Sequence, residues 1–572
     1  MKNLLNSIFK ILQMPAMKIC SIIMLGTALR LWGISWGLPF GYNPDENLIL
    51  LIVMNFFTGD YDPHAFMYPT FFMYIVFSML SFLHFLLNGL TLFNITVDDP
   101  ITLFLSDPTF FYILARSVSA VFGILTIYIL YKIGCEVFSE KIGLVAAFLL
   151  SVNFLHIQHS HFATTDVTLT FFVLLCYRYI YRIYANDTIT AYVRSGIIAG
   201  LATSTKYNAG LLFLPITVAS LCVKGSILTH RIRSLFNHKL ILAGFMMVLF
   251  FILGSPYVVL DYSNFWGALV KQSENMRGYI TFLNTSSGYL YFIKEGLSYG
   301  MRKPLAIFSI MAIIWALVYK PSRRELLFLC FPISYYLIIG AWGSKFNRYL
   351  LIIFPIMFLY AAHFFLFLIF LFFKRFPKKQ QLILLLGLCI LAGPSFLRAC
   401  YENYMMTQPP TQTLTKEWAD SNIPPNSKVI VEGFSYPPLA KSLSQLKNEV
   451  KLPSNVSQIH NLKTVFLIKT FDETKPHYQV VTLFHEETRF GKALSIENRQ
   501  IADADYFIIN KELDDIIEQG GSRGAEAKKL HDYIREKGKL LKNISPDETL
   551  EIWGWEVKFR KRTGPIFEIY QL

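Results

Sequence analysis

The stretch Gly41-Tyr42-Asn43-Pro44-Asp45-Glu46-Asn47 follows directly on an apolar run over residues 19–36. Two adjacent carboxylates at the end of a membrane helix are costly to hold near lipid. Pro44 fixes the turn, so Asp45 and Glu46 are expected in the first turn of a new helix, where the helix dipole favours carboxylates. An ordinary helix start has the same pattern. The rest of the chain must therefore decide what this stretch does.

The composition is that of a membrane protein. The chain has 572 residues, of which 53% are hydrophobic and 16% charged. Repeated apolar runs approach the ~20 residues that cross a bilayer, which predicts a mostly α, polytopic helix bundle of about eleven spans. The candidate spans are residues 19–36, 69–90, 110–131, 144–156, 167–184, 193–204, 209–222, 240–254, 305–319, 326–342, 349–373 and 382–397.

Basic connections predict the orientation of these spans. The net charge of +14 belongs to the part before about residue 400, because acids and bases nearly cancel after it. This excess indicates topology rather than nucleic-acid binding. The basic connections 224–239, 320–324 and 374–379 are expected in the cytoplasm together with the amino terminus. The span count then requires residues 69–90 not to cross, which makes 37–109 an outer loop.

The last part of the chain reads as a separate soluble domain. We expect a multi-spanning domain over residues 1–400 and a soluble, extracytoplasmic α/β domain over 401–572, long enough for its own core. The expected strands are 428–432, 463–469 and 504–510, and a hairpin of 553–559 with 565–570 closes the domain. The expected helices are 414–421 and 526–537. No cofactor fingerprint is found here.

A second polar stretch, from His156 to Asp166, lies at an expected outer helix junction. His159 and His161 with an aspartate could ligate a metal, but the loose spacing forms no closed tetrahedral set. We therefore expect the histidines to shape a polar pocket. Asp166 is expected either to cap the helix that follows or to act in catalysis.

Isolated cations stand near the outer ends of several spans. Lys206, followed by Tyr207, interrupts an apolar stretch and is expensive there unless it reaches water or an anion. Snorkelling to the interface is the simpler explanation, and a phosphate contact is the functional one. Arg116 and Arg348 are similarly placed. Arg30 lies deeper in the first span and is expected to be structural.

Together these residues resemble the GT-C glycosyltransferases. The pattern comprises the early Pro-Asp-Glu, Asp166, Thr205-Lys206-Tyr207-Asn208, Ser255-Pro256-Tyr257 with Asp261, and Arg348-Tyr349 followed by Pro355. The resemblance covers about residues 10–400. It is strongest to the branch that holds the protein O-mannosyltransferases and the aminoarabinose transferase of lipid A. The aminoarabinose branch has a Lys-Pro pair after the first loop, where this chain has Tyr68-Pro69, so the donor phosphate contact and the sugar stay open.

The resemblance implies an enzyme that moves a sugar from a polyprenyl phosphate to a protein, lipid or glycan acceptor on the outer face, with inversion. It implies Asp45 as the base. Glu46 would orient Asp45 or hold a divalent ion, and Asp166 is a further catalytic candidate. The expected phosphate contacts are Lys206, Arg116 and Arg348, since a phosphate leaving group calls for fixed cations. Tyr68 and Tyr207 join the two histidines as pocket residues.

The expected location is the plasma or inner membrane, with surrounding lipids as further partners. Two other classes of protein remain open. A transporter or lipid flippase also needs buried charges and broken helices, although no internal repeat is found. A membrane scaffold that presents the soluble tail is the third alternative. Substitution of Asp45 separates them, because only an enzyme should lose turnover while it keeps its fold and donor binding.

Overall fold

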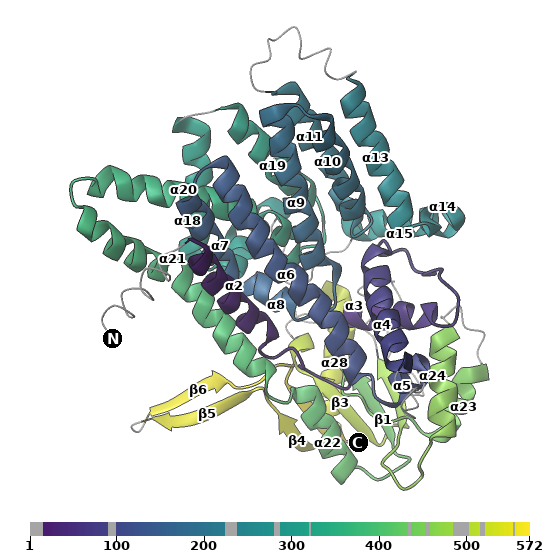
Figure 1. Cartoon of the computed structure of the whole chain (residues 1–572). Coiled ribbons are helices and arrows are strands. Elements are labelled where there is room, and N and C mark those ends of the chain that lie inside the picture. The colour runs from purple at the N-terminus through teal and green to yellow at the C-terminus, as the bar shows by residue number, and fades with distance from the viewer. Residues whose placement is uncertain are drawn as a thin grey trace.

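The computed structural model is a helical bundle with a small sheet domain beneath it (Figure 1). Its description covers residues 15–89, 99–223, 237–278, 287–319, 322–432, 436–451, 458–483, 503–514, 521–552 and 555–572. Most of the basic connection 224–239 and the start of 320–324 lie outside these residues.

The bundle is built from apolar helices joined by short connections. Its main helices are α2 (Pro15–Leu31), α6 (Thr109–Val137), α7 (Glu140–Ser151), α8 (Phe154–Ser160), α9 (Thr165–Asn186), α10 (Ile189–Thr203), α11 (Phe213–Leu221), α13 (His238–Gly254), α18 (Lys303–Tyr319), α19 (Arg323–Gly340), α20 (Phe354–Phe373) and α21 (Pro377–Met406). Shorter elements lie between them, namely α3 (Pro44–Phe56), α4 (Phe71–Gly89), α5 (Pro100–Ser106), η2 (Tyr207–Leu212), α14 (Tyr257–Leu260), α15 (Tyr262–Gly278), α16 (Gly288–Tyr291), η4 (Phe292–Gly296), α17 (Leu297–Met301) and η5 (Asn347–Ile352).

The expected fold class, a polytopic helix bundle with an α/β tail, is confirmed. By length and composition, 4 helical segments of the described chain could cross a membrane, or up to 5 if the bent pair α7–α8 is one span. Four shorter apolar helices accompany them. The number of crossings, about eleven, stays a prediction that rests on the basic connections.

Helix α4 covers most of residues 69–90, the segment expected not to cross. It is long and apolar enough to span a bilayer. It lies beside α3 and α5, on the side of the bundle that faces the sheet domain (Figure 1). Its place at the outer surface therefore remains a prediction.

A bend of 60° separates α7 from α8. The buried guanidinium of Arg30 holds it, donating hydrogen bonds to the carbonyl oxygens of Leu150 (3.3 Å) and Ser151 (3.1 Å). The same group lies 3.0 Å from Nδ1 of His156 on α8. A cation suits the carbonyl-rich end of a helix. Arg30 is thus structural, as expected from its depth.

The tail forms a five-stranded sheet in the order β2-β1-β3-β7-β4. Strands β1 (Lys428–Glu432), β2 (Gln479–Leu483) and β3 (Tyr506–Asn510) are parallel, and β7 (Phe567–Gln571) runs antiparallel to β3 and to β4 (Lys539–Ile544). Successive residues of β1 and β3 face two separate hydrophobic clusters, so the sheet is covered on both faces. Helices pack around it, namely α22 (Thr411–Asn422), α23 (Leu443–Lys451), α24 (Gln458–Lys469) and α28 (Gly521–Lys537).

Two expectations for the tail are wrong. Residues 463–469 belong to helix α24, because a short apolar run does not by itself distinguish a strand from a buried helix. The expected closing hairpin also pairs differently. β6 (Trp555–Arg560) pairs with β5 (Asp547–Ile552), whereas β7 inserts between β3 and β4. The expected strands 428–432 and 504–510 and both expected helices are present.

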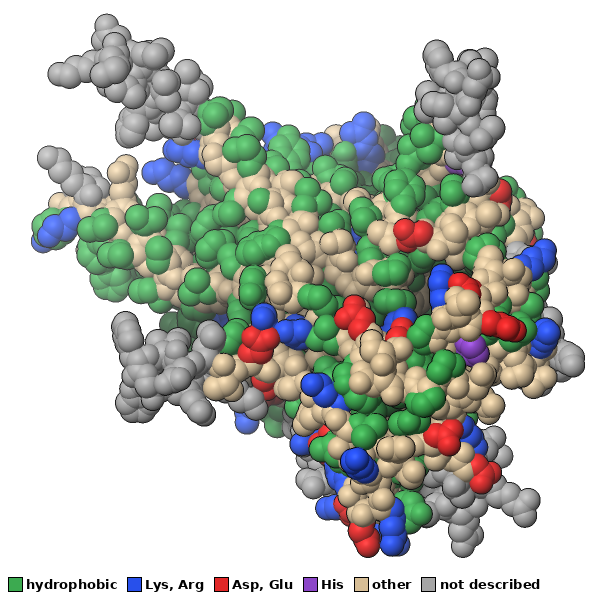
Figure 2. Space-filling view, turned by 90° about the horizontal axis from the view of Figure 1, so that it is seen from below, with side chains coloured by type: hydrophobic (Ala, Val, Ile, Leu, Met, Phe, Trp, Pro, Cys, Tyr) green, Lys and Arg blue, Asp and Glu red, His purple; other side chains and the backbone are tan. Residues whose placement is uncertain are grey.

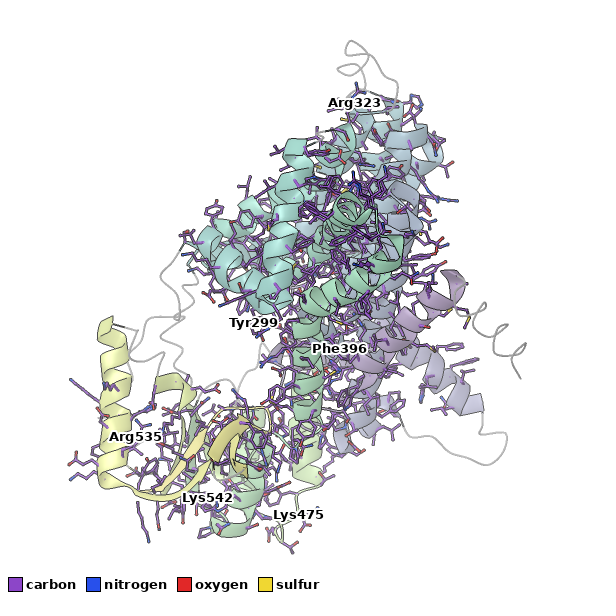
Figure 3. All side chains as sticks on the ribbon, turned by 90° about the vertical axis from the view of Figure 1, so that its left-hand side faces the viewer. Tyr299, Arg323, Phe396, Lys475, Arg535 and Lys542 are labelled. Atoms are coloured by element: carbon purple, nitrogen blue, oxygen red, sulfur yellow. The ribbon has the colours of Figure 1, made fainter. Side chains whose placement is uncertain are left out.

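Hydrophobic and charged side chains lie on different parts of the surface. Seen from below, hydrophobic side chains dominate the side of α20 and α21, and charged side chains gather over the tail domain (Figure 2). Arg323, from the basic connection expected in the cytoplasm, lies at the end of the molecule opposite Lys475, Arg535 and Lys542 of the tail (Figure 3). The arrangement fits one basic end and one end that carries the soluble domain.

Candidate active site

Asp45 lies in the first turn of α3, as expected. The side chain of Asn43 caps this helix, accepting hydrogen bonds from the backbone N–H groups of Asp45 (3.1 Å) and Glu46 (3.4 Å). Pro44 occupies the first helical position. The cap fixes both carboxylates at the positive end of the helix dipole, which stabilises their charge.

The carboxylate of Asp45 pairs with Arg348, which lies 303 residues further along the chain. Arg348 stands in η5, directly after the short loop that follows α19. The side chains of Asp45 and Arg348 are 19% and 21% exposed, so the pair is sheltered but accessible. The guanidinium Nε of Arg348 is buried and has no hydrogen-bond partner among the described residues.

A second pair joins Asp166 and Lys206. Lys206 Nζ donates to Asp166 Oδ1 over 2.7 Å, and both side chains are largely buried. Lys206 lies where α10 ends and η2 begins. Asp166 is the second residue of α9, whose N-cap is Thr164, so the expectation that Asp166 caps this helix is wrong. The carboxylate stabilises Lys206 instead.

Two buried tyrosines connect the pairs. Lys206 Nζ lies 5.8 Å from the ring centroid of Tyr68 and 5.5 Å from that of Tyr349. Both rings offer their faces to the ammonium group. Tyr68 interacts electrostatically with Asp45, Arg348 and Asp166, so the two ion pairs form one cluster. Sequence reasoning did not assign Tyr349 to the site, although its adjacency to Arg348 was a signal.

The predicted histidines divide between two roles. His159 interacts electrostatically with all four charges of the cluster, and its Nδ1 has no hydrogen-bond partner among the described residues. It belongs to the pocket. The ring nitrogens of His161 each lie 2.9 Å from a backbone oxygen, of Ile157 and of Trp32. His161 is buried and holds the backbone, so its expected place in the pocket is not supported.

Tyr207 also points away from the cluster. Its hydroxyl donates to the carbonyl oxygen of Phe66 (3.2 Å), and its ring packs on Phe251 and Phe265. The side chain therefore supports the loop that leads to Tyr68. Its role is structural rather than the pocket contact expected from the sequence.

Glu46 and Arg116 form a third pair that is completely buried. Arg116 donates from Nε to Oε1 (2.7 Å) and from Nη2 to Oε2 (2.8 Å) of Glu46, and both side chains are 0% exposed. Arg116 Nη1 also donates to the carbonyl oxygens of Ile34 and Trp36. The backbone N–H of Ala163 donates to Glu46 over 3.0 Å. These bonds join α3, α6 and the loop before Asp166.

This pairing changes two expected roles. Arg116 uses four of its five N–H donors on Glu46 and backbone oxygens, and its side chain is completely buried, so it is poorly placed to contact a donor phosphate. Glu46 has both oxygens occupied, so it is a poor ion ligand. Within the described parts of the chain, no group of three acidic, histidine or cysteine side chains is arranged to hold a metal ion. We therefore assign Glu46 and Arg116 a positioning role.

Comparison with known proteins confirms the resemblance inferred from the sequence. Residues 113–258 match the family described as dolichyl-phosphate-mannose-protein mannosyltransferase. This segment contains Asp166 and Lys206. Curated protein sequences gave no match. The chain thus resembles the GT-C glycosyltransferases in sequence as well as in fold.

The fold resembles that of a solved glycosyltransferase structure. ArnT from Cupriavidus metallidurans, bound to undecaprenyl phosphate, aligns over 96% of this chain and 97% of its own, with a TM-score of 0.50 and 11% identity. The oligosaccharyltransferase of Archaeoglobus fulgidus, tethered to an acceptor peptide, aligns over 95% of this chain and 74% of its own, with a TM-score of 0.48 and 11% identity.

Proposed function

We propose that this protein transfers a sugar from a polyprenyl-phosphate carrier to an acceptor hydroxyl at the outer face of the membrane, with inversion. One observation carries the proposal: two carboxylates and two cations from four distant segments meet in one sheltered cluster. The ArnT fold, solved with undecaprenyl phosphate, and the mannosyltransferase family match support it.

In this reaction Asp45 acts as the general base. It accepts the proton of the acceptor hydroxyl while the oxygen attacks the anomeric carbon, and the bond from that carbon to the phosphate oxygen breaks. A single displacement inverts the anomeric centre. Asp45 fits this role better than Asp166, because it is 19% exposed whereas Asp166 is 5% exposed and bound to Lys206.

The leaving polyprenyl phosphate carries the electron pair away and needs fixed positive charge. Arg348 and Lys206 supply it from rigid elements in a site that excludes most water, where such charges act strongly. Tyr68 and Tyr349 shape the wall beside them. Nδ1 of His159, which has no hydrogen-bond partner among the described residues, can contact the sugar or the phosphate.

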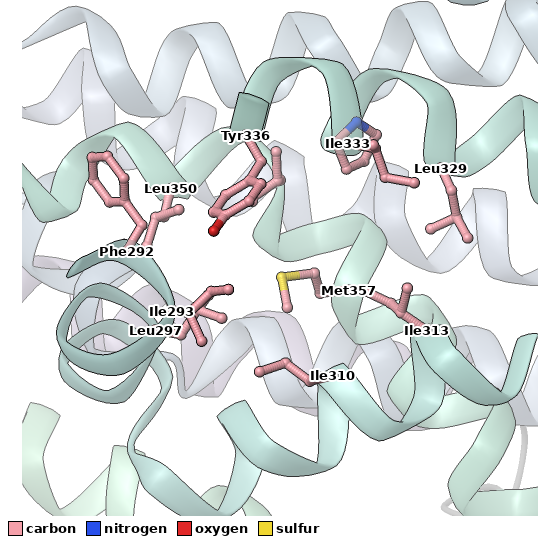
Figure 4. Close-up of a pocket in the computed structure, with 12 residues that line it drawn as sticks. Phe292, Ile293, Leu297, Ile310, Ile313, Leu329, Ile333, Tyr336, Leu350 and Met357 are labelled. Carbon is pink, nitrogen blue, oxygen red and sulfur yellow. The ribbon is translucent and has the colours of Figure 1, made fainter. Parts of the chain in front are cut away.

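The carrier tail requires an apolar groove, and the element that carries Arg348, η5, also lines one. A cavity of about 240 Å³ lies between η4, α18, α19 and α20, and Leu350, two residues after Arg348, lines it. Its other walls include Ile310, Leu329 and Met357, all of which face the same space (Figure 4). Isoprenoid chains bind by burial of such apolar surface. We therefore assign the tail to this cavity.

The sidedness follows from charge. The cluster residues lie at helix ends, in the first turns of α3 and α9, after α10 and in η5. Tyr42, three residues before Asp45, is hydrogen-bonded to Thr413 of the tail domain, whereas Arg323 lies at the end of the molecule opposite the tail (Figure 3). With basic connections in the cytoplasm, the cluster and the tail domain lie outside. A transporter would instead place its charges near the middle of the membrane. The position at helix ends favours the enzyme.

The test is transfer by the purified chain in lipid discs, supplied with labelled polyprenyl-phosphate sugars and a panel of acceptors. We expect label on an acceptor with the wild type and a loss of at least about 10²-fold with Asp45→Asn. Reconstitution into vesicles tests the alternative. Movement of labelled carrier across the membrane without transfer to any acceptor would refute the enzyme and support a flippase.

A further inference from the structure

The segment 33–43, which joins α2 to α3, lies between the bundle and the tail domain. Gly33 has φ +91°, and a Cβ there would come within 3.0 Å of Met406 Cβ at the end of α21. Gly41 has φ +62°, and a Cβ there would meet the hydroxyl of Tyr112 at 2.5 Å. Glycine is needed at both places, for conformation and for close approach. The backbone of this segment is therefore closely constrained on its way to Asp45.

Two hydrogen bonds attach this segment to the tail domain. Trp36 Nε1 donates to Thr563 Oγ1 over 2.6 Å, and the hydroxyls of Tyr42 and Thr413 share a hydrogen bond of 2.8 Å. Thr563 is itself fixed, because its carbonyl oxygen accepts from the backbone N–H of Thr411 at the start of α22. Both contacts thus lead into the body of the tail domain.

The same two aromatic side chains contact each other, and Trp36 also contacts the segments that lead to the site. The Trp36 ring packs edge-on against Phe162 (5.6 Å) and Tyr42 (6.1 Å). Phe162 precedes Ala163, whose backbone N–H donates to Glu46. The carbonyl oxygen of Trp36 accepts from Arg116 over 2.8 Å. Trp36 therefore contacts the segments that carry both candidate acids as well as the tail domain.

We propose that Trp36 and Tyr42 are positioning residues through which the tail domain holds Asp45 in its productive place. The proposal rests on the proposed function, since it assigns Asp45 the role of base. A base must lie within hydrogen-bond reach of the hydroxyl, and a shift of about 1 Å can lower a rate by about 10². The tail is then part of the catalytic structure and not only an appended module.

The experiment removes the two hydroxyls on the tail side and leaves the site intact. Thr413→Val with Thr563→Val keeps side-chain size but abolishes both bonds. The matched control is Thr413→Ser with Thr563→Ser, which keeps a hydroxyl at each place. Three quantities are measured on the full chain in lipid discs: turnover, affinity for undecaprenyl phosphate, and backbone amide exchange in residues 41–47.

We expect the valine variant to exchange amides faster in residues 41–47 and to lose about tenfold in turnover, because Asp45 is no longer held. Its affinity for undecaprenyl phosphate should not fall, because Arg348 and Lys206 lie outside the segment. The serine variant should match the wild type in all three.

Unchanged amide exchange and turnover in the valine variant would overturn the proposal, as would equal losses in the serine variant. A fall in affinity that matches the fall in turnover would also overturn it, because that pattern indicates general destabilisation. Failure of the proposed function looks different, since the wild type would then transfer no sugar and bind no undecaprenyl phosphate. The amide exchange can still be compared in that case.

Discussion

Replacing Asp45 by Asn should change turnover and carrier affinity in opposite directions. Arg348 is bound to Asp45, so a phosphate that binds the guanidinium must compete with this carboxylate. Asparagine keeps the size and most of the capping ability of aspartate, so the fold should persist. It removes the competing charge and the carboxylate that we propose accepts the proton.

The magnitude follows from the exposure of the pair. Exposed ion pairs contribute up to ~1 kcal/mol, and breaking fully buried ones costs ~3–5 kcal/mol. At 19% and 21% exposure, the Asp45–Arg348 pair lies between these limits. We take about 1–2 kcal/mol, which corresponds to an affinity for undecaprenyl phosphate about five- to thirtyfold higher in Asp45→Asn. Turnover should fall by at least about 10²-fold.

Carrier affinity is measured by titration of undecaprenyl phosphate into the protein in lipid discs, and turnover by transfer of labelled sugar. Asp62→Asn is the control, because it removes the same charge from the loop before α4, where the side chain of Asp62 interacts with His64. Near-normal turnover in Asp45→Asn would leave Pro44-Asp45-Glu46 as an ordinary helix start and transfer the role of base to Asp166. Weaker carrier binding would refute the competition between phosphate and carboxylate.

Three further predictions concern the other charges. Arg348→Ala should weaken binding of undecaprenyl phosphate by at least about tenfold, measured by the same titration, because it removes a fixed cation from the phosphate site. Glu46→Gln should destabilise the protein by about 3–5 kcal/mol in thermal unfolding, because it leaves Arg116 buried without its counter-ion. Added divalent ions should not restore it, whereas Glu46→Gln with Arg116→Met should recover part of the stability. For His531, burial opposes the charged form, but hydrogen bonds with Asp514 and Glu432 outweigh it and raise the pKa to about 9. The stability from this shift is present below pH ~6.5 and is lost as the pH rises through ~9, by up to about 3 kcal/mol, and pulse proteolysis of the tail in the full chain should show the loss in the wild type but not in His531→Gln.

Local chemistry made much of this protein predictable. The cap, proline and acids of residues 43–46 are sufficient to start a helix, and they do so in the structure. Apolar length predicted the bundle, and strongly apolar runs predicted β1 and β3. The prediction of a strand at the Val-Phe-Leu-Ile run of α24 was wrong, because strands and buried helices share that composition. The predicted partner of β7 was also wrong, because pairing between strands that are distant in sequence leaves no local signal.

The sequence predicted which charged residues belong to the site, but not which acid pairs with which cation. Asp45, Glu46, Asp166, Lys206, Arg116 and Arg348 were all expected near the outer face, and each one is half of an ion pair. Which acid binds which cation depends on side-chain direction across contacts of 40, 70 and 303 residues in sequence separation. Hydropathy and charge patterns give no information at that range. The same limit explains why His161 and Tyr207 were assigned to the pocket.

The two neighbouring acids show why this limit matters for function. Adjacent residues on a helix point about 100° apart, so Asp45 and Glu46 cannot face the same partner. Glu46 points into the bundle and is wholly buried against Arg116, whereas Asp45 is 19% exposed beside Arg348. Glu46 therefore has the properties of a permanent structural anchor. Asp45 has those of a base that is freed when a phosphate takes its place on Arg348. Since Glu46 joins α3 to the loop before Asp166, this anchor holds together the two segments that carry the candidate acids, and the Asp45–Arg348 pair is the more exposed part of the site.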